Sequence, residues 1–92
     1  MNTSISLEAQ KALWIASLAI LNDAKLIDKV NREVGNLGWT TSRGVYLQCL
    51  SNEIRERPFN SNILFEFNTN GTVAAFSLKN KVQLRNNTLE FK

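Results

Sequence analysis

Apolar and polar residues alternate along the C-terminal third of the chain, from about residue 62 to residue 92. Alternation is typical of half-buried β-strands, because successive side chains of a strand point to opposite faces of the sheet. Short segments rich in Asn, Gly or Lys interrupt the pattern at 68–71, 79–81 and 86–87. Asn and Gly tolerate the positive φ angles of tight hairpin turns. The pattern therefore predicts a four-stranded antiparallel β-meander.

The turn lengths set the register of this meander. A two-residue turn at 86–87 pairs Leu84 with Leu89 and Val82 with Phe91. A slip of one residue would turn a whole strand over, so the match of apolar with apolar side chains supports this register.

The other two loops give matches of the same kind. The three-residue loop pairs Phe76 with Leu84, and the four-residue loop pairs Phe65 with Ala74. The predicted inner face of the sheet consists of Ile63, Phe65, Phe67, Phe76, Leu78, Val82, Leu84, Leu89 and Phe91. The predicted solvent-exposed face carries Leu64, Val73 and Ala75.

The first half of the chain has the character of helices. Ser6 is a suitable N-cap for a helix from Leu7 to about Leu21. A second helix is expected over 24–34, because Asn22 or Asp23 can cap it. Gly35 then suits the position after the helix, where a left-handed conformation is common.

A third helix is expected from a cap at Thr41 or Ser42 to about Glu56, ended by Pro58. The stretch 44–50 is rich in β-prone residues, so a strand is the alternative there.

Together these elements predict an α+β fold. Two or three N-terminal helices, at about 6–56, are expected to pack on one face of the meander at about 62–92. With 92 residues, of which 43% are hydrophobic, the chain is expected to form a single domain over 1–92 with a true core.

The first helix is unusual because the run from Ala12 to Leu21 is apolar nearly all round. A helix that is apolar on every side is normally buried on every side. Either this is the central helix of the domain, or part of the helix surface, around Trp14 and Leu18, forms a contact with a second copy in a homodimer or with another partner.

The composition argues against several kinds of chemistry. The chain has no histidine and one cysteine, which disfavours a zinc, haem or iron–sulfur site and rules out an internal disulfide. We expect no cofactor and no enzymatic activity. Carboxylate pairs such as Glu53 with Glu56 fit solvent-exposed charges better than a catalytic site. The apolar run is shorter than the roughly 20 residues needed to span a bilayer, so we expect a cytoplasmic protein without membrane contact.

The net charge of +3 arises in the last hairpin. Residues 1–78 hold seven basic and seven acidic residues, whereas 79–92 hold four basic residues and one acidic residue. Lys81, Arg85 and Lys92 fall on one outer face of that hairpin. Lysine on an edge strand discourages aggregation, and the alternative is an anionic partner.

The order helix, glycine-bearing turn, helix and hairpin resembles a winged helix-turn-helix in topology. The segment 37–42 would be the turn, and the side chains facing DNA would be Arg43, Gln48, Asn52 and Arg55. Balanced charge on the helix and a hairpin tip without a basic residue count against this comparison.

The sequence therefore leads to one function class with one alternative. We expect a small regulatory or interaction protein that binds another macromolecule, a protein in first place. Binding of nucleic acid, through the third helix or the basic hairpin, is the alternative. The two differ in their response to salt, because phosphate contacts release counterions.

Overall fold

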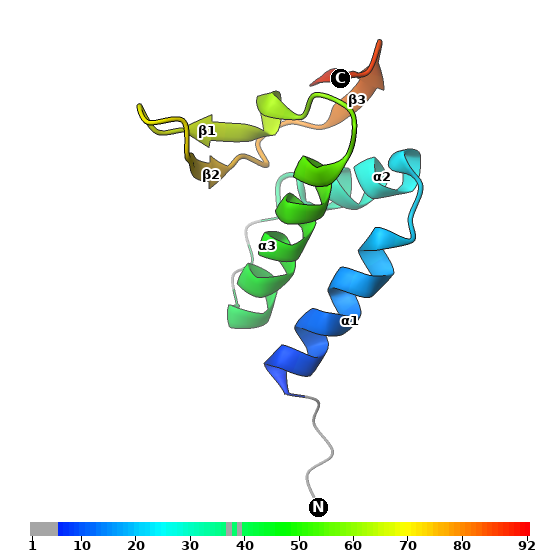
Figure 1. The fold of residues 1–92 in the computed structure, drawn as a ribbon, viewed down its shortest axis with the longest axis vertical. Helices are drawn as coiled ribbons and strands as arrows, with labels where there is room; N and C mark the ends of the chain where they lie inside the picture. Colours follow the sequence, from blue (N-terminus) through cyan, green and yellow to red (C-terminus); the bar gives the residue numbers. More distant parts are fainter. Residues whose placement is uncertain (1–5, 37, 39) are drawn as a thin grey trace, which may run out of the picture.

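The structure, a computed structural model, describes residues 6–36, 38 and 40–92. In this part of the chain, three helices precede two antiparallel hairpins (Figure 1). The helices are α1 (Leu7–Ala19), α2 (Asp23–Glu33) and α3 (Thr41–Glu56), followed by the 3₁₀ turn η1 (Asn62–Leu64). The strands are β1 (Phe65–Phe67), β2 (Val73–Phe76), β3 (Val82–Arg85) and β4 (Thr88–Phe91). The predicted α+β class and the order of its elements are confirmed.

Each helix begins at a side-chain cap. Ser6, Asn22 and Thr40 each accept a hydrogen bond from the backbone N–H three residues further on, at 3.2, 2.8 and 3.1 Å. The first two caps are those expected, while the third lies just before the predicted Thr41 or Ser42. The stretch 44–50 belongs to α3, so the strand alternative is wrong there. Gly35 follows α2 with a φ of 78°, as expected for a residue just beyond a helix.

The central helix is α3 rather than α1. α1 lies beside α3 and runs in the same direction (Figure 1). The N-terminal end of α1 is the end farther from the hairpins. The ring of Trp14 meets the ring of Tyr46 edge to face, with 5.3 Å between centroids. Leu18 and Cys49 are buried at the same contact. Of the two interpretations of this helix, the central-helix interpretation is therefore wrong, because the one extensive contact of α1 among the described elements is with α3.

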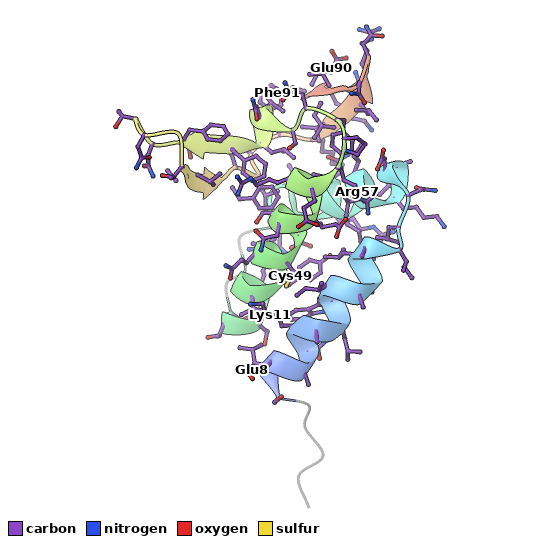
Figure 2. All side chains as sticks on the ribbon, in the orientation of Figure 1. Glu8, Lys11, Cys49, Arg57, Glu90 and Phe91 are labelled. Carbon is purple, nitrogen blue, oxygen red and sulfur yellow. The ribbon has the colours of Figure 1, made fainter. Side chains whose placement is uncertain are left out.

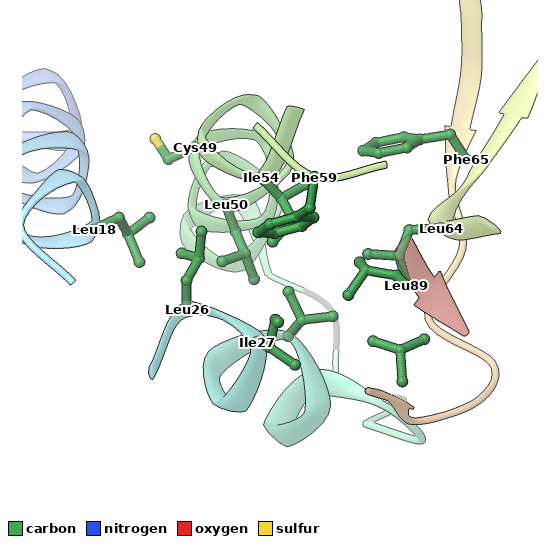
Figure 3. Packing of buried hydrophobic residues seen from close by; sticks show 12 residues of the cluster. Leu18, Leu26, Ile27, Cys49, Leu50, Ile54, Phe59, Leu64, Phe65 and Leu89 are labelled. Carbon is green, nitrogen blue, oxygen red and sulfur yellow. The ribbon is translucent and has the colours of Figure 1, made fainter. Parts of the chain in front are cut away.

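The core lies between α2, α3 and the hairpins (Figure 3). Its most completely buried large side chains are Leu26, Leu50, Ile54, Leu64, Val30 and Val82. Leu64 was predicted on the solvent-exposed face of a strand, but it lies in η1, whose turn directs it into the core.

The β3–β4 hairpin has the predicted register, with Leu84 opposite Leu89 and Val82 opposite Phe91. Its turn residues, Asn86 and Asn87, both have positive φ angles, of 51° and 63°. This conformation matches the twist of a two-residue hairpin, and asparagine adopts it more readily than most residues.

The β1–β2 hairpin departs from the predicted register. Phe65 pairs with Phe76 rather than with Ala74, and the pairing shifts irregularly between Glu66 and Phe67. An extra residue at such a bulge changes the register of everything beyond it. Position 63 lies in η1 and not in a strand.

The predicted four-stranded sheet is broken between β2 and β3, and Asn31 of α2 shows why. The Lys92 N–H donates to the Lys81 carbonyl, so the polar groups of Val82 point away from β4. The Asn31 side chain accepts from the Val82 N–H at 2.8 Å and donates to its carbonyl at 2.9 Å. The edge of β3 that β2 was expected to occupy is therefore occupied by a helix side chain at this point.

The separation of the hairpins also corrects the predicted inner face. Phe65, Val82 and Leu89 are buried as expected. The half-buried members are Ile63, Phe76 and Leu78. The exposed members are Phe67, Leu84 and Phe91.

The bond between Asn31 and Val82 predicts a large loss of stability for Asn31→Ala. The substitution leaves two buried backbone groups of Val82 without partners, at a cost of about 2–4 kcal/mol in the free energy of unfolding. Gln83→Ala removes only an exposed hydrogen bond to Glu90 and should cost less than about 0.5 kcal/mol. Urea denaturation of both variants measures the difference. Equal losses would show that the Asn31 contact does not hold β3.

The contact between α1 and α3 predicts that the single tyrosine, Tyr46, has a raised pKa in the folded protein. Burial raises the pKa of the Tyr46 phenol above its ordinary value, and Glu33 adds to this rise while Arg32 opposes it. The neutral phenol therefore stabilises the fold below the unfolded pKa of about 10, and this contribution is lost as the pH rises through the folded pKa.

Ultraviolet absorbance of the phenolate should show a midpoint above 10.0 in the native protein and a lower one in denaturant. Trp14→Ala should move the native midpoint down, since it uncovers the phenol. Coincident native and denatured titrations would contradict burial of Tyr46 against α1.

Candidate functional site: an apolar helix face

The side of α1 that points away from α3 is exposed to solvent and carries apolar side chains. Leu13, Ile15 and Ile20 expose 54%, 49% and 84% of their surface. Among the described residues, four of the seven exposed large apolar side chains lie on α1 or at its C-cap. Clustering of this kind is informative, whereas single exposed apolar residues are common on any protein.

Four exposed residues form a straight stripe on this side, which we call the outer face of α1: Ala9, Leu13, Ala16 and Ile20. Their spacing of four, three and four residues keeps them in line along a helix. The stripe itself contains no charged residue, and Glu8 and Lys11 lie near its N-terminal end (Figure 2). A further alanine, Ala12, extends it sideways.

The predicted partner residues on this helix lie on its other side. Leu18 is 2% exposed and belongs to the core cluster. Trp14 is half-buried against Tyr46. Neither placement fits a surface for another molecule, because both side chains are already used to join α1 to α3. The prediction that the helix retains surplus apolar surface holds for its outer face instead.

Arg57, just after α3, fixes how α1 is held (Figure 2). Its guanidinium donates to the Asp23 carboxylate at 2.8 Å, to Glu53 at 2.8 Å and to the Leu18 carbonyl at 3.1 Å. One side chain therefore joins the last turns of α1 and α3 to the first turn of α2. Glu53, which we expected to be solvent-exposed, is largely covered by this ion pair.

Burial alone would lower the pKa of the Arg57 guanidinium. The hydrogen bonds to Asp23 and Glu53, with the charges of those carboxylates, outweigh burial and raise the pKa above its ordinary value. The guanidinium therefore stays protonated in both the folded and the unfolded chain over the ordinary pH range, and it adds no pH dependence of its own to stability.

The basic residues of the last hairpin divide into two groups. The register keeps them on one face, as predicted, but Arg85 lies 3.5 Å from Glu90 at the turn. Lys81 and Lys92 lie at the other end of the hairpin, where they line a hollow together with Arg32 of α2. Asp28 borders the same hollow and offsets part of the charge.

Of the four residues proposed to face DNA, three lie together on an exposed side of α3 and Arg43 does not. Arg43 forms an ion pair with Glu33 at 3.2 Å, and both side chains are mostly buried. Gln48, Asn52 and Arg55 are exposed on one side of α3. The Arg55 guanidinium also lies over a ring of the first hairpin. In the proposed turn, residues 37 and 39 lie outside the described residues.

Comparisons with other proteins add no further assignment. No family model, no curated protein and no solved structure matches this chain. Within the described ranges, no helix is long and apolar enough to cross a membrane. The same residues contain no group of three side chains placed to hold a metal ion. The functional argument therefore rests on the surfaces themselves.

The hydrogen bonds of Arg57 to Asp23, Glu53 and the Leu18 carbonyl predict that Arg57→Met destabilises the protein. The expected loss in the free energy of unfolding is about 2–4 kcal/mol. The substitution leaves the largely buried Glu53 carboxylate without its cation and the Leu18 carbonyl without its donor, while Asp23 is exposed enough to recover water contacts. Arg55→Met removes a cation of the same size from an exposed site and should cost less than about 1 kcal/mol. Thermal and urea denaturation measure both losses. Similar stabilities for the two variants would show that the hydrogen bonds of Arg57 do not stabilise the packing of the three helices.

Proposed function

We propose that this protein is a small, non-enzymatic interaction protein that binds another protein through the outer face of α1. The observation that carries the proposal is the exposure of Leu13 and Ile20 on a helix whose other side packs against α3 through Trp14 and Leu18. Leaving such side chains in water costs about 1.5–3 kcal/mol each relative to burial. A partner that covers them recovers this free energy.

The chemistry of this face fits recognition by an apolar helix or groove. Two large side chains, Leu13 and Ile20, lie seven residues apart and can serve as anchors. Ala9 and Ala16 lie between and beside them and let another backbone come close. Helix recognition commonly uses anchors at this spacing. The core of protein interfaces is also depleted of charged residues, as this stripe is.

Nucleic-acid binding remains the second candidate, favoured by one observation. Gln48, Asn52 and Arg55 are exposed on one side of α3, next to the β1–β2 hairpin. Two of the basic residues that would strengthen this candidate are engaged in ion pairs, Arg43 with Glu33 and Arg85 with Glu90. The apolar face of α1 therefore provides the stronger support.

The proposal predicts which surface is in contact with a partner. A photoreactive phenylalanine analogue at position 13 should form protein adducts in extract of the native host, and the same analogue at Gln48 should not. Adding wild-type protein as competitor should suppress the adducts. Adding Leu13→Glu/Ile20→Glu should suppress them at least about tenfold less well, because a carboxylate cannot enter an apolar interface without a large desolvation cost.

The double variant is expected to keep its fold, because both positions are exposed, and circular dichroism checks this. Adducts only from position 48, or nucleic-acid adducts that fade with added salt, would favour the second candidate. Equal competition by the wild type and the double variant would contradict the proposal.

A further inference from the structure

We infer that the molecule covering the outer face of α1 is a second copy of this chain, paired antiparallel with the first. The inference rests on the proposed function, since it names the partner for the same surface. Its starting point is the size pattern along the stripe, which alternates small and large: Ala9, Leu13, Ala16, Ile20.

The spacing of the stripe is that of a two-helix seam. Residues four, three and four apart correspond to alternating core positions of a coiled coil, where side chains of one helix enter spaces on the other. In an antiparallel pair with its twofold axis midway between Leu13 and Ala16, position 13 of one copy meets position 16 of the other. Position 20 then meets position 9 of the second copy by the same symmetry.

Every layer of that pair combines one large and one small side chain. Leu13 packs on Ala16 of the second copy, and Ile20 packs on its Ala9. In a parallel pair, Leu13 would meet Leu13 and Ala16 would meet Ala16, so crowded and empty layers would alternate. Interiors tolerate neither voids nor overpacking. The sequence of the face is therefore complementary to itself in the antiparallel sense, which is the requirement for a twofold interface.

Charge favours the same arrangement. The outer face adds no like charges to a self-contact, because its four residues are neutral. The excess of positive charge lies in 79–92, beyond the C-terminal end of α1 (Figure 1). Antiparallel pairing places the two basic hairpins at opposite ends of the dimer, whereas parallel pairing places them side by side. The helix dipoles are also opposed in the antiparallel pair.

The area available sets the strength of the contact. α1 has 13 residues, which gives a length of about 20 Å and a width of about 10 Å. This footprint is well below the roughly 800 Å² per partner of a standard stable interface. The dimer is therefore expected to be weak and reversible, with a dissociation constant of the order of 100 µM, which corresponds to about −5.5 kcal/mol.

Sedimentation equilibrium tests the pairing. The wild-type protein should change from monomer to dimer between about 10 µM and 1 mM, around the expected dissociation constant. Leu13→Glu/Ile20→Glu should remain monomeric throughout. Gln48→Glu/Asn52→Glu changes the net charge by the same amount on α3, and it should dimerise like the wild type. Dimerisation of the first variant, or loss of it in the second, would overturn the inference.

Cysteine cross-linking tests the direction of the pair. Ala9→Cys and Ile20→Cys proteins, mixed and mildly oxidised, should form a disulfide between the two variants. Ala9→Cys alone should form none, because antiparallel pairing separates the two copies of position 9 by about 16 Å along the axis, beyond the roughly 7 Å that a disulfide allows. The native Cys49 is buried and stays in place. A ready disulfide from Ala9→Cys alone would overturn the antiparallel arrangement.

The results separate this inference from the proposed function. A wild-type protein that stays monomeric at 1 mM, yet forms competed adducts from position 13 with a different protein, overturns the second copy as partner and keeps the binding face. A monomer that also forms no such adducts overturns both.

Discussion

The arrangement of the three helices depends on one side chain, that of Arg57. Its guanidinium reaches the end of α1, the start of α2 and the last turn of α3 at once. α1 has contacts along α3 and none of comparable extent with either hairpin. The direction in which α1 leaves the core, and hence the side it presents to solvent, is therefore set by packing along α3 and by this junction. A lysine could not replace it, because its three N–H donors share a single nitrogen, whereas Arg57 reaches its three acceptors from three separate nitrogens.

Local features of the fold could be predicted from the sequence because their causes are local. The register of the β3–β4 hairpin follows from its two-asparagine turn, and the helix starts follow from the caps at Ser6 and Asn22. The break between β2 and β3 could not be predicted. Its cause is a contact between residues 31 and 82, and nothing in the pattern of the strands shows that a distant asparagine holds that edge.

The same limit applies to the candidate site. The sequence indicates that α1 has more apolar surface than the chain can cover, but it cannot say which side remains bare. Leu18, Leu13 and Ile20 have side chains of the same size and the same apolar character. Nothing in the sequence therefore shows that α3 covers Trp14 and Leu18 and leaves the other two exposed. Arg43 is similar, because only the structure reveals that Glu33 neutralises it. Arg57 was missed as an organiser, although its spacing of four residues from Glu53 is a signal that could have found the pair.

The contacts made by the two edges of the β3–β4 hairpin affect how copies of this chain can associate. Asn31 binds the outer edge of β3, and Asn60 binds β4 through the Asn87 carbonyl and the Leu89 N–H. An open strand edge recruits further strands without limit, as in fibrils. Each edge of this hairpin is bonded at one place to an asparagine of the same chain, which hinders such growth here. Contacts through a helix face are used up once a single partner is bound, so assembly that begins on α1 ends at a defined size.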